Sequence, residues 1–252
     1  MQTLVYLPLR ARAESLRMLM RHASIPYTDR IIQLADWPSL KTAMPNKMLP
    51  VLELEDGTLL PETADIAMHI ASMHDLTVPP SRWLLPSEPN AAHACWRETS
   101  LTAAPYLNLT DLMADSMPSD ARIGACNPLL NFITAEEALP LIPRYLAYAT
   151  PWVQALETRL DDSGPFLGGI TPHYGDFNTF HIADQITTID GGRALESCSL
   201  SVRMWYASVA ALPAVADYLN VRPQPGTGQL GKPGSLIHEF ARPHVEIASR
   251  AK

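Results

Sequence analysis

Four residues within positions 44–71 have types and a spacing that suit the binding of a small peptide. Leu49-Pro50 closes a loop just before a short apolar run, where an X-Pro bond can be cis and the backbone of Leu49 can pair with a peptide-like ligand. Glu62-Thr63 opens a predicted helix, whose N–H groups and dipole attract a carboxylate, while Glu62 can bind an ammonium group. The pattern favours a zwitterionic peptide ligand. The alternative is a solvent-facing hairpin followed by a helix cap.

The elements that must position these residues follow the order strand, helix, strand, connection, hairpin and helix. Apolar periodicity and the turn signal Asp56-Gly57 predict them at residues 1–7, 10–22, 27–34, 51–54, 58–60 and 64–73. This order is typical of a thioredoxin-like layer, in which helices cover a mixed sheet. Redox proteins of that fold carry Cys-x-x-Cys after the first strand, whereas residues 6–10 (YLPLR) contain no cysteine. We therefore expect no thiol–disulfide exchange by the protein itself.

Composition narrows the class of function. The chain has 252 residues, of which 47% are hydrophobic, enough for two packed domains. Its formal net charge of −7 argues against nucleic-acid binding, which requires clustered cations. No run of 18 apolar residues predicts a membrane span, and the first residues do not resemble a signal peptide. The three widely spaced cysteines, Cys95, Cys126 and Cys198, fit buried thiols in a reducing compartment, so we expect a cytoplasmic protein.

The second half of the chain is predicted to be helical. A proline-rich linker at residues 77–90 precedes it, and helices are expected at residues 91–115, 141–160, 176–189, 193–211 and 213–220. Prolines, a glycine and a Glu-Glu pair mark residues 116–140 as an irregular insertion. Residues 223–252 begin with linker composition and form a C-terminal extension, for which we expect packing on the helical domain. The histidines lack the spacing of metal ligands, so no metal site is predicted.

Several blocks of the sequence resemble cytosolic glutathione transferases of the tyrosine type. Residues 5–14 (VYLPLRARAE) look like the opening of these proteins, and residues 33–41 (QLADWPSLK) and 44–71 resemble the next two blocks, most similar to the sigma class. Farther on, the segments FLGG, YGDF and LPAVADY resemble the helical-domain signature and a late helix. The resemblance implies an α/β thioredoxin-like domain at residues 1–76 and an all-α helical domain at residues 91–222, which together make the glutathione transferase fold.

The resemblance gives Tyr6 and Arg12 the catalytic roles, with glutathione as cosubstrate. An ordinary thiol titrates near ~8.5, so the protein must favour the thiolate. Lowering that pKa by about two units requires roughly 2.7 kcal/mol, most of which one charge-assisted hydrogen bond can supply. Tyr6 would donate this bond, and the charge of Arg12 would support the anion. The alternatives are a core tyrosine and a surface arginine.

The resemblance also implies how glutathione is held. Trp37 and Lys41, one helical turn apart, resemble the family's clamps on the glycine carboxylate; the alternative is a packed tryptophan beside a solvated lysine. Leu49, ahead of Pro50, would pair its backbone with the cysteinyl unit. Glu62 and Thr63 would hold the γ-glutamyl end.

This sequence departs from the sigma-like pattern at several positions. Glu62 and Thr63 stand where Gln-Ser is usual, and Met48 stands where a polar or basic residue is usual. The acid that the partner subunit often supplies near the glutamyl amine has no counterpart around Thr102. His173 occupies the place of the Ser or Thr that would form a capping box with Asp176, so we expect that box to be imperfect.

The second substrate would be a small hydrophobic electrophile between the domains, beside Leu7, Leu9, Tyr106 and Met113. The implied function is that of a detoxifying glutathione transferase, with peroxidase or isomerase side activity. A non-catalytic glutathione-transferase-like ligand carrier or scaffold is the alternative, because fold alone does not select an activity. The resemblance also implies a homodimer about a two-fold axis.

Overall fold

The structure is a computed structural model that describes residues 1–7, 10–33, 35–74, 76, 153–154, 156–160, 164–167 and 169–222. The predicted linker at 77–90, the insertion near 116–140 and the extension at 223–252 lie outside these residues. So do the predicted pocket residues Leu9, Tyr106 and Met113.

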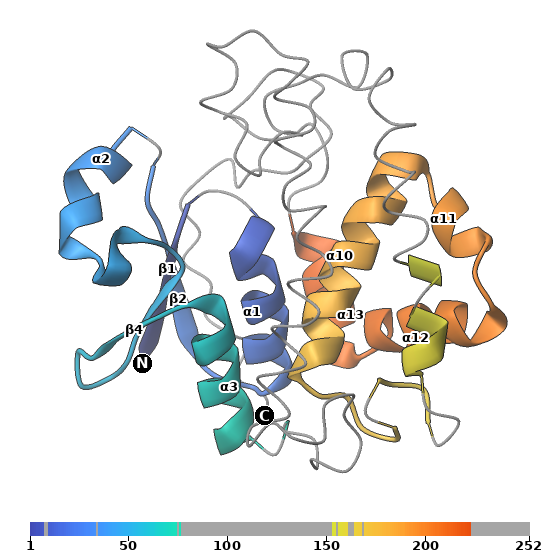
Figure 1. Cartoon of the computed structure of the whole chain (residues 1–252). Coiled ribbons are helices and arrows are strands. Elements are labelled where there is room, and N and C mark those ends of the chain that lie inside the picture. Colours follow the sequence, from blue (N-terminus) through green and yellow to red (C-terminus); the bar gives the residue numbers. More distant parts are fainter. Residues whose placement is uncertain are drawn as a thin grey trace, which may run out of the picture.

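Four strands form one mixed sheet in the N-terminal part of the chain (Figure 1). Their bounds are β1 Gln2–Tyr6, β2 Tyr27–Ile31, β3 Val51–Glu53 and β4 Leu59–Pro61. The order is β2-β1-β3-β4, with β1 parallel to β2 and antiparallel to β3, and β3 antiparallel to β4. This confirms the predicted thioredoxin-like layer. Pro61 lies in the edge strand β4, where its missing N–H is tolerated.

Helices cover both faces of this sheet. On one face lie α1 Ala11–His22 and α3 Thr63–Met73, and on the other lies the short α2 Trp37–Leu40 (Figure 1). The alternation of β1 explains the arrangement, because successive side chains of a strand point to opposite faces. Leu4 and Tyr6 belong to the main core cluster, whereas Val5 belongs to the second, smaller cluster, against which Trp37 packs.

In the helical part, residues 153–154 are helical and the 3-10 turn η5 Leu156–Arg159 follows them. The helices that the structure describes after it are α10 Tyr174–Asp190, α11 Arg193–Glu196, α12 Leu200–Ala210 and α13 Pro213–Val221. The single helix predicted over residues 193–211 is therefore wrong. The Ser197 hydroxyl donates to the C=O of Ala194, and the Ser199 side chain caps α12 by accepting the N–H of Val202. These local side-chain bonds compete with a continuous helix.

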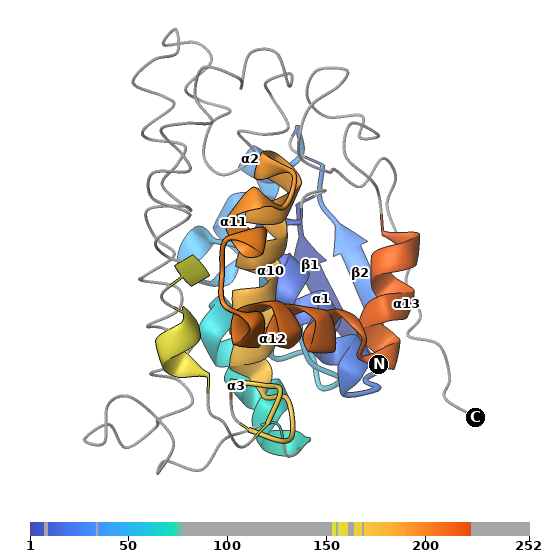
Figure 2. The same ribbon diagram turned by 90° about the vertical axis from the view of Figure 1, so that its right-hand side faces the viewer.

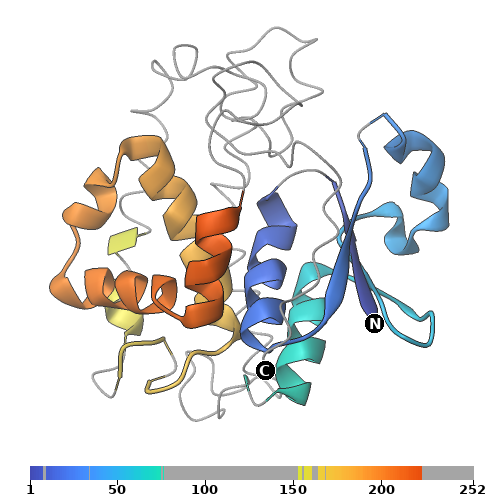
Figure 3. The same ribbon diagram turned by 180° about the vertical axis from the view of Figure 1, so that it is seen from behind.

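One hydrophobic core joins the two parts. α1 lies against α10 and α13, an arrangement visible from two further directions (Figures 2 and 3). Fully buried side chains from the sheet, such as Leu4, share this core with Trp205 of α12 and Tyr218 of α13. The helical part therefore packs directly against α1, the first helix of the sheet domain. Among the described residues, no helix combines the length and apolar character needed to cross a membrane.

Candidate active site

Tyr6 ends β1 with its ring in the core and its hydroxyl at the start of α1. The hydroxyl oxygen accepts the backbone N–H of Arg12 at 3.3 Å, so its own hydrogen can be donated to a ligand. Burial raises the pKa of Tyr6 above its ordinary value, although the Arg12 N–H and the charges of Arg12 and Arg17 act the other way. Tyr6 is therefore a neutral hydrogen-bond donor at neutral pH.

Two arginines of α1 lie near this hydroxyl and act on its pKa. Arg12 lies in the first turn of α1, where the helix dipole adds partial positive charge, and its side chain is exposed. The guanidinium of Arg17, which is fully buried, lies 5.9 Å from the centre of the Tyr6 ring. Sequence reasoning missed Arg17. The available signal was the i,i+3 and i,i+4 spacing of Arg10, Glu14 and Arg17, which predicts paired charges on one helix face.

Trp37 and Lys41 lie on the opposite face of the sheet from α1. Trp37 is half-buried against the cluster of Val5, Ile32 and Val51, and its indole N–H has no partner among the described residues. Lys41 is exposed and follows α2 directly, where its backbone N–H bonds the C=O of Trp37. One turn thus separates an available indole donor from an ammonium group.

The Leu49–Pro50 peptide bond is cis, as the sequence suggested. Pro50 is buried and Leu49 half-buried, with the Leu49 side chain packed against both core clusters. Within the described part of the chain, the backbone N–H and C=O of Leu49 have no hydrogen-bond partner. The segment before β3 therefore presents one unpaired donor and one unpaired acceptor, which an extended peptide could engage.

Glu62 and Thr63 form the start of α3. Glu62 has φ +67°, a backbone conformation that costs about 1–3 kcal/mol for a residue other than glycine. Its carboxylate accepts a hydrogen bond from Asn46 at 3.1 Å, a neighbour that sequence reasoning did not identify. Helix geometry leaves the N–H groups of Thr63 and Ala64 without an intrahelical partner. This strained turn therefore presents a carboxylate, a hydroxyl and backbone donors together.

The structure places some of the predicted residues against shared hydrophobic clusters. Trp37 and Leu49 pack on one cluster, and Leu49 also contacts the main core, to which Tyr6 belongs. Leu7, the described member of the predicted hydrophobic pocket, is half-buried against both clusters. Chemically, the arrangement offers a neutral hydroxyl donor, backbone pairing groups, cations and one carboxylate. Among the described residues no group of His, Cys, Asp or Glu side chains could hold a metal ion.

Comparisons with known proteins point to the glutathione transferases. Residues 144–222 match the family described as Glutathione S-transferase, C-terminal domain. Over 69 residues the chain is 45% identical to S-crystallin SL11 of Nototodarus sloanii, a match that covers 27% of this chain and 34% of that protein. Over 73 residues it is 37% identical to the hematopoietic prostaglandin D synthase of Homo sapiens, covering 29% of this chain and 36% of that protein. The chain thus spans about a third of the length of these curated relatives.

A solved structure extends the likeness to most of the chain. Monomeric Na-GST-3, a glutathione S-transferase of the hookworm Necator americanus, superposes with a TM-score of 0.65 at 19% identity. The superposition covers 88% of this chain and 98% of that one, which shows a shared fold.

Proposed function

Because this chain belongs to the cytosolic glutathione transferase family, on its sigma-like side, we propose that it activates the glutathione thiol for attack on hydrophobic electrophiles. The observation that carries the proposal is the geometry of Tyr6. Its hydroxyl accepts the Arg12 N–H at 3.3 Å and keeps its own hydrogen for a ligand. A sulfur that accepts this hydrogen is stabilised as the thiolate, because hydrogen bonding to a charged form favours that form.

In this proposal glutathione lies along the segment before β3. The free N–H and C=O of Leu49 pair with its cysteinyl unit, and the cis Pro50 follows in the buried start of the strand. Trp37 and Lys41 bind the glycine carboxylate. The α3 N-terminus at Thr63 binds the glutamyl carboxylate, and Glu62 binds the glutamyl ammonium. Each group of the ligand thus meets a complementary group of the protein.

The reaction then proceeds between the thiolate and an electrophile at the apolar wall predicted around Leu7. With an activated aryl chloride, the sulfur electron pair forms the carbon–sulfur bond, the carbon–chlorine bond breaks and chloride leaves. The thiol proton passes to solvent when the thiolate forms. Tyr6 contributes by stabilising the anion before attack, and Arg12 contributes positive charge nearby.

A titration of thermal stability with glutathione tests the proposal. Glutathione at a hundred times its dissociation constant should stabilise the fold by about 2.7 kcal/mol. Cysteinylglycine is the matched control, because it keeps the thiol and lacks the glutamyl group that Glu62 and Thr63 would bind. Conjugation of an activated aryl chloride is then measured in the same preparation. The absence of any stabilisation at millimolar glutathione would contradict both the binding site and the enzyme.

A second candidate function is a non-catalytic carrier or scaffold. It is favoured by the match to a relative named as a crystallin and by the exposed Met48, which offers no polar contact to glutathione. The same experiment separates the two functions. Stabilisation by glutathione without conjugation of any electrophile would support the carrier.

We propose that the chain forms a homodimer, the assembly implied by the resemblance. The superposable hookworm protein is described as monomeric, so family membership does not decide the point. Light scattering at micromolar concentration should give twice the chain mass of 27.7 kDa, and a mass equal to that of one chain would contradict the dimer. The cytoplasmic location stays a prediction, which fractionation of cells would check.

A further inference from the structure

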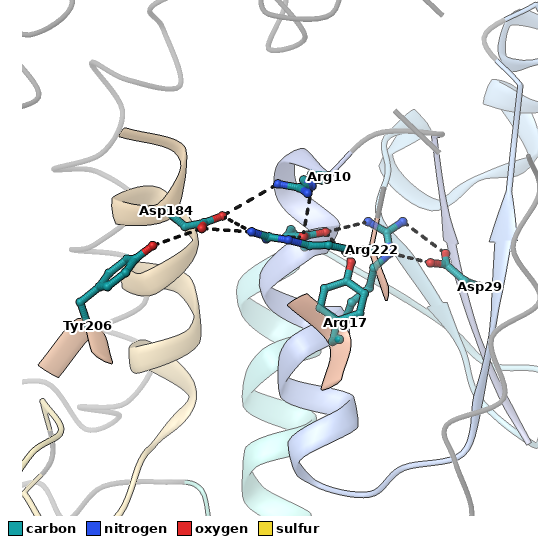
Figure 4. A network of polar contacts seen from close by, with 8 residues as sticks. Arg10, Arg17, Asp29, Asp184, Tyr206 and Arg222 are labelled. Atoms are coloured by element: carbon teal, nitrogen blue, oxygen red, sulfur yellow. Dashed lines mark hydrogen bonds and ion pairs between the residues drawn. The ribbon is translucent and has the colours of Figure 1, made fainter. Parts of the chain in front are cut away.

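Six charged side chains form a buried cluster where the helical part meets α1 (Figure 4). Its members are the guanidinium groups of Arg10, Arg17 and Arg222 and the carboxylates of Glu14, Asp29 and Asp184. Their formal charges cancel. They come from β2, α1, α10 and the end of α13, so the cluster joins the two parts of the fold.

Glu14 of α1 is the member that the helical part holds most directly. It is fully buried, and Tyr218 of α13 donates its hydroxyl hydrogen to one carboxylate oxygen at 2.7 Å. Arg222, which caps the end of α13, donates to the other oxygen at 3.1 Å. Arg10 and Arg17 each have a nitrogen 3.6 Å from the same carboxylate. Burial alone would raise the pKa of Glu14, but the charges of Arg10, Arg222 and Arg17 lower it to about 2.

The same turn of α1 carries the hydrogen bond to Tyr6. Arg10 precedes α1, and its C=O accepts the N–H of Glu14 at 3.0 Å. Between these two residues, Arg12 donates its N–H to the Tyr6 hydroxyl at 3.3 Å. The Arg10 side chain also reaches Asp184 of α10 at 3.9 Å. Contacts from the helical part therefore hold both ends of the turn that contains the Arg12 donor.

We propose that Tyr218 and Arg222 are positioning residues for Tyr6, acting through Glu14 on the first turn of α1. The proposal rests on the proposed function, because it concerns the same thiolate. A hydrogen bond of 3.3 Å is already long, since N–H···O bonds in proteins usually measure about 2.7–3.2 Å. A further displacement of the turn away from Tyr6 would therefore weaken or break the bond from the Arg12 N–H.

The loss of this N–H has a defined chemical effect. A hydroxyl that accepts a hydrogen bond is polarised and becomes a stronger donor, since hydrogen bonds in a chain strengthen one another. Without the Arg12 N–H, Tyr6 stabilises the thiolate less, and the pKa of the bound thiol rises. Replacing a buried ion network by apolar packing is often neutral for stability, so stability alone does not account for this cluster.

Tyr218→Phe is the primary test, because it removes one hydroxyl and keeps the ring beside Arg21, whose guanidinium lies 4.7 Å from the ring centre. We expect the pKa of bound glutathione, measured from thiolate absorbance against pH, to rise by about half a unit to one unit. The conjugation rate at neutral pH should fall about 3- to 10-fold and recover at higher pH. The KM for glutathione should change less than twofold, because Tyr218 is fully buried and its hydroxyl is bonded to Glu14.

Further variants separate positioning from general destabilisation. Arg222→Lys keeps a cation and should retain most of the wild-type thiol pKa, whereas Arg222→Met should raise it. Trp205→Phe is the matched control, because it removes a buried hydrogen bond of 2.8 Å to Asp176 that lies outside the cluster. This control should lower stability and leave the thiol pKa unchanged. If Arg222→Met does not fold, the thiol pKa measured in Tyr218→Phe still decides whether the positioning role holds.

The outcomes distinguish this inference from the function on which it rests. A wild-type protein that forms no thiolate with bound glutathione overturns the proposed function and, with it, the positioning role. A wild-type protein with a lowered thiol pKa that Tyr218→Phe and Arg222→Met both leave unchanged overturns the positioning role alone.

Discussion

Tyr6 shows at the scale of one residue how a core position can also carry chemistry. Its ring packs with Leu4 and Leu16 in the main cluster, while its hydroxyl meets the first turn of α1. Because burial raises its pKa, the hydroxyl stays protonated at neutral pH and can donate to a thiolate. An ionised tyrosine could not do so.

Tyr6→Phe should therefore reduce the rate of conjugation at neutral pH without a large loss of glutathione binding. The substitution removes the donor and keeps the ring packing, so the pKa of the bound thiol should rise. A loss of about 1.4–2.7 kcal/mol of thiolate stabilisation corresponds to a ten- to hundred-fold lower rate. The measurement is the rate against pH for both proteins, and the variant should recover partly at high pH. Superimposed profiles would mean that Tyr6 is only a core tyrosine.

At the scale of an element, α10 begins with a complete capping box, whereas the sequence led us to expect an imperfect one. His173 closes the capping box with its imidazole: Nδ1 accepts the N–H of Gly175 at 3.0 Å, and Asp176 accepts the N–H of His173 at 3.0 Å. The Asp176 carboxylate also accepts bonds from Leu167 and Trp205. Burial lowers the pKa of His173, and the charge of Asp176 acts in the opposite direction. The imidazole therefore stays neutral at neutral pH, and its unprotonated Nδ1 accepts the Gly175 N–H.

We predict that His173→Leu lowers the free energy of unfolding by about 1–2 kcal/mol, the usual effect of losing a helix cap. His173→Asn is the matched control, because its side-chain oxygen can accept the Gly175 N–H. Urea unfolding at pH 7.5 and 5.5 measures both. The wild type should lose stability on acidification, since protonation of His173 removes the acceptor, and the Asn variant should lose less. Equal stability of the Leu and Asn variants would exclude a capping role.

At the scale of the whole molecule, the buried cluster makes the junction of the two parts sensitive to acid. His181 of α10 lies next to it, and burial lowers the pKa of this histidine to about 4, against the opposing effect of Glu14 and Asp184. Arg222 and Arg10 act in the same direction as burial. The folded protein therefore excludes a proton that the unfolded chain binds below about pH 6.5.

Stability should fall as the pH drops from about 6.5 towards 4, because the unfolded state then binds the extra proton. A histidine whose pKa falls over this range on folding contributes about 3 kcal/mol to the free energy of unfolding, and this contribution is lost by about pH 4. The depressed pKa of Glu14 adds a further loss between about pH 4.5 and 2. Chemical unfolding at several pH values measures the slope. His181→Gln should flatten the upper part of the curve, and an unchanged slope in this variant would contradict the assignment.

The sequence by itself determined the strands and helices of the sheet domain and their order. The strand predicted at residues 1–7, the turn at Asp56-Gly57 and the proline at position 50 are local signals, and the structure has the expected mixed sheet there. Nearest neighbours along the chain encode such features, because backbone conformation and amphipathic periodicity depend on a few consecutive residues. The break of the last long helix at residues 197–199 was missed, since serine side chains compete locally in ways that periodicity does not register.

Only the tertiary structure decided which side chains share a buried environment. Glu14 and Arg222 are separated by 208 positions, and nothing near either residue indicates that they pair. The donation of the Arg12 N–H to Tyr6 and the bond from Asn46 to Glu62 likewise follow from how helices and strands pack. A buried charge needs a partner, but the sequence does not say which one. The packing of α1 against α10 and α13 makes that choice, and it brings Tyr218 and Arg222 to Glu14 in the turn that supports Tyr6.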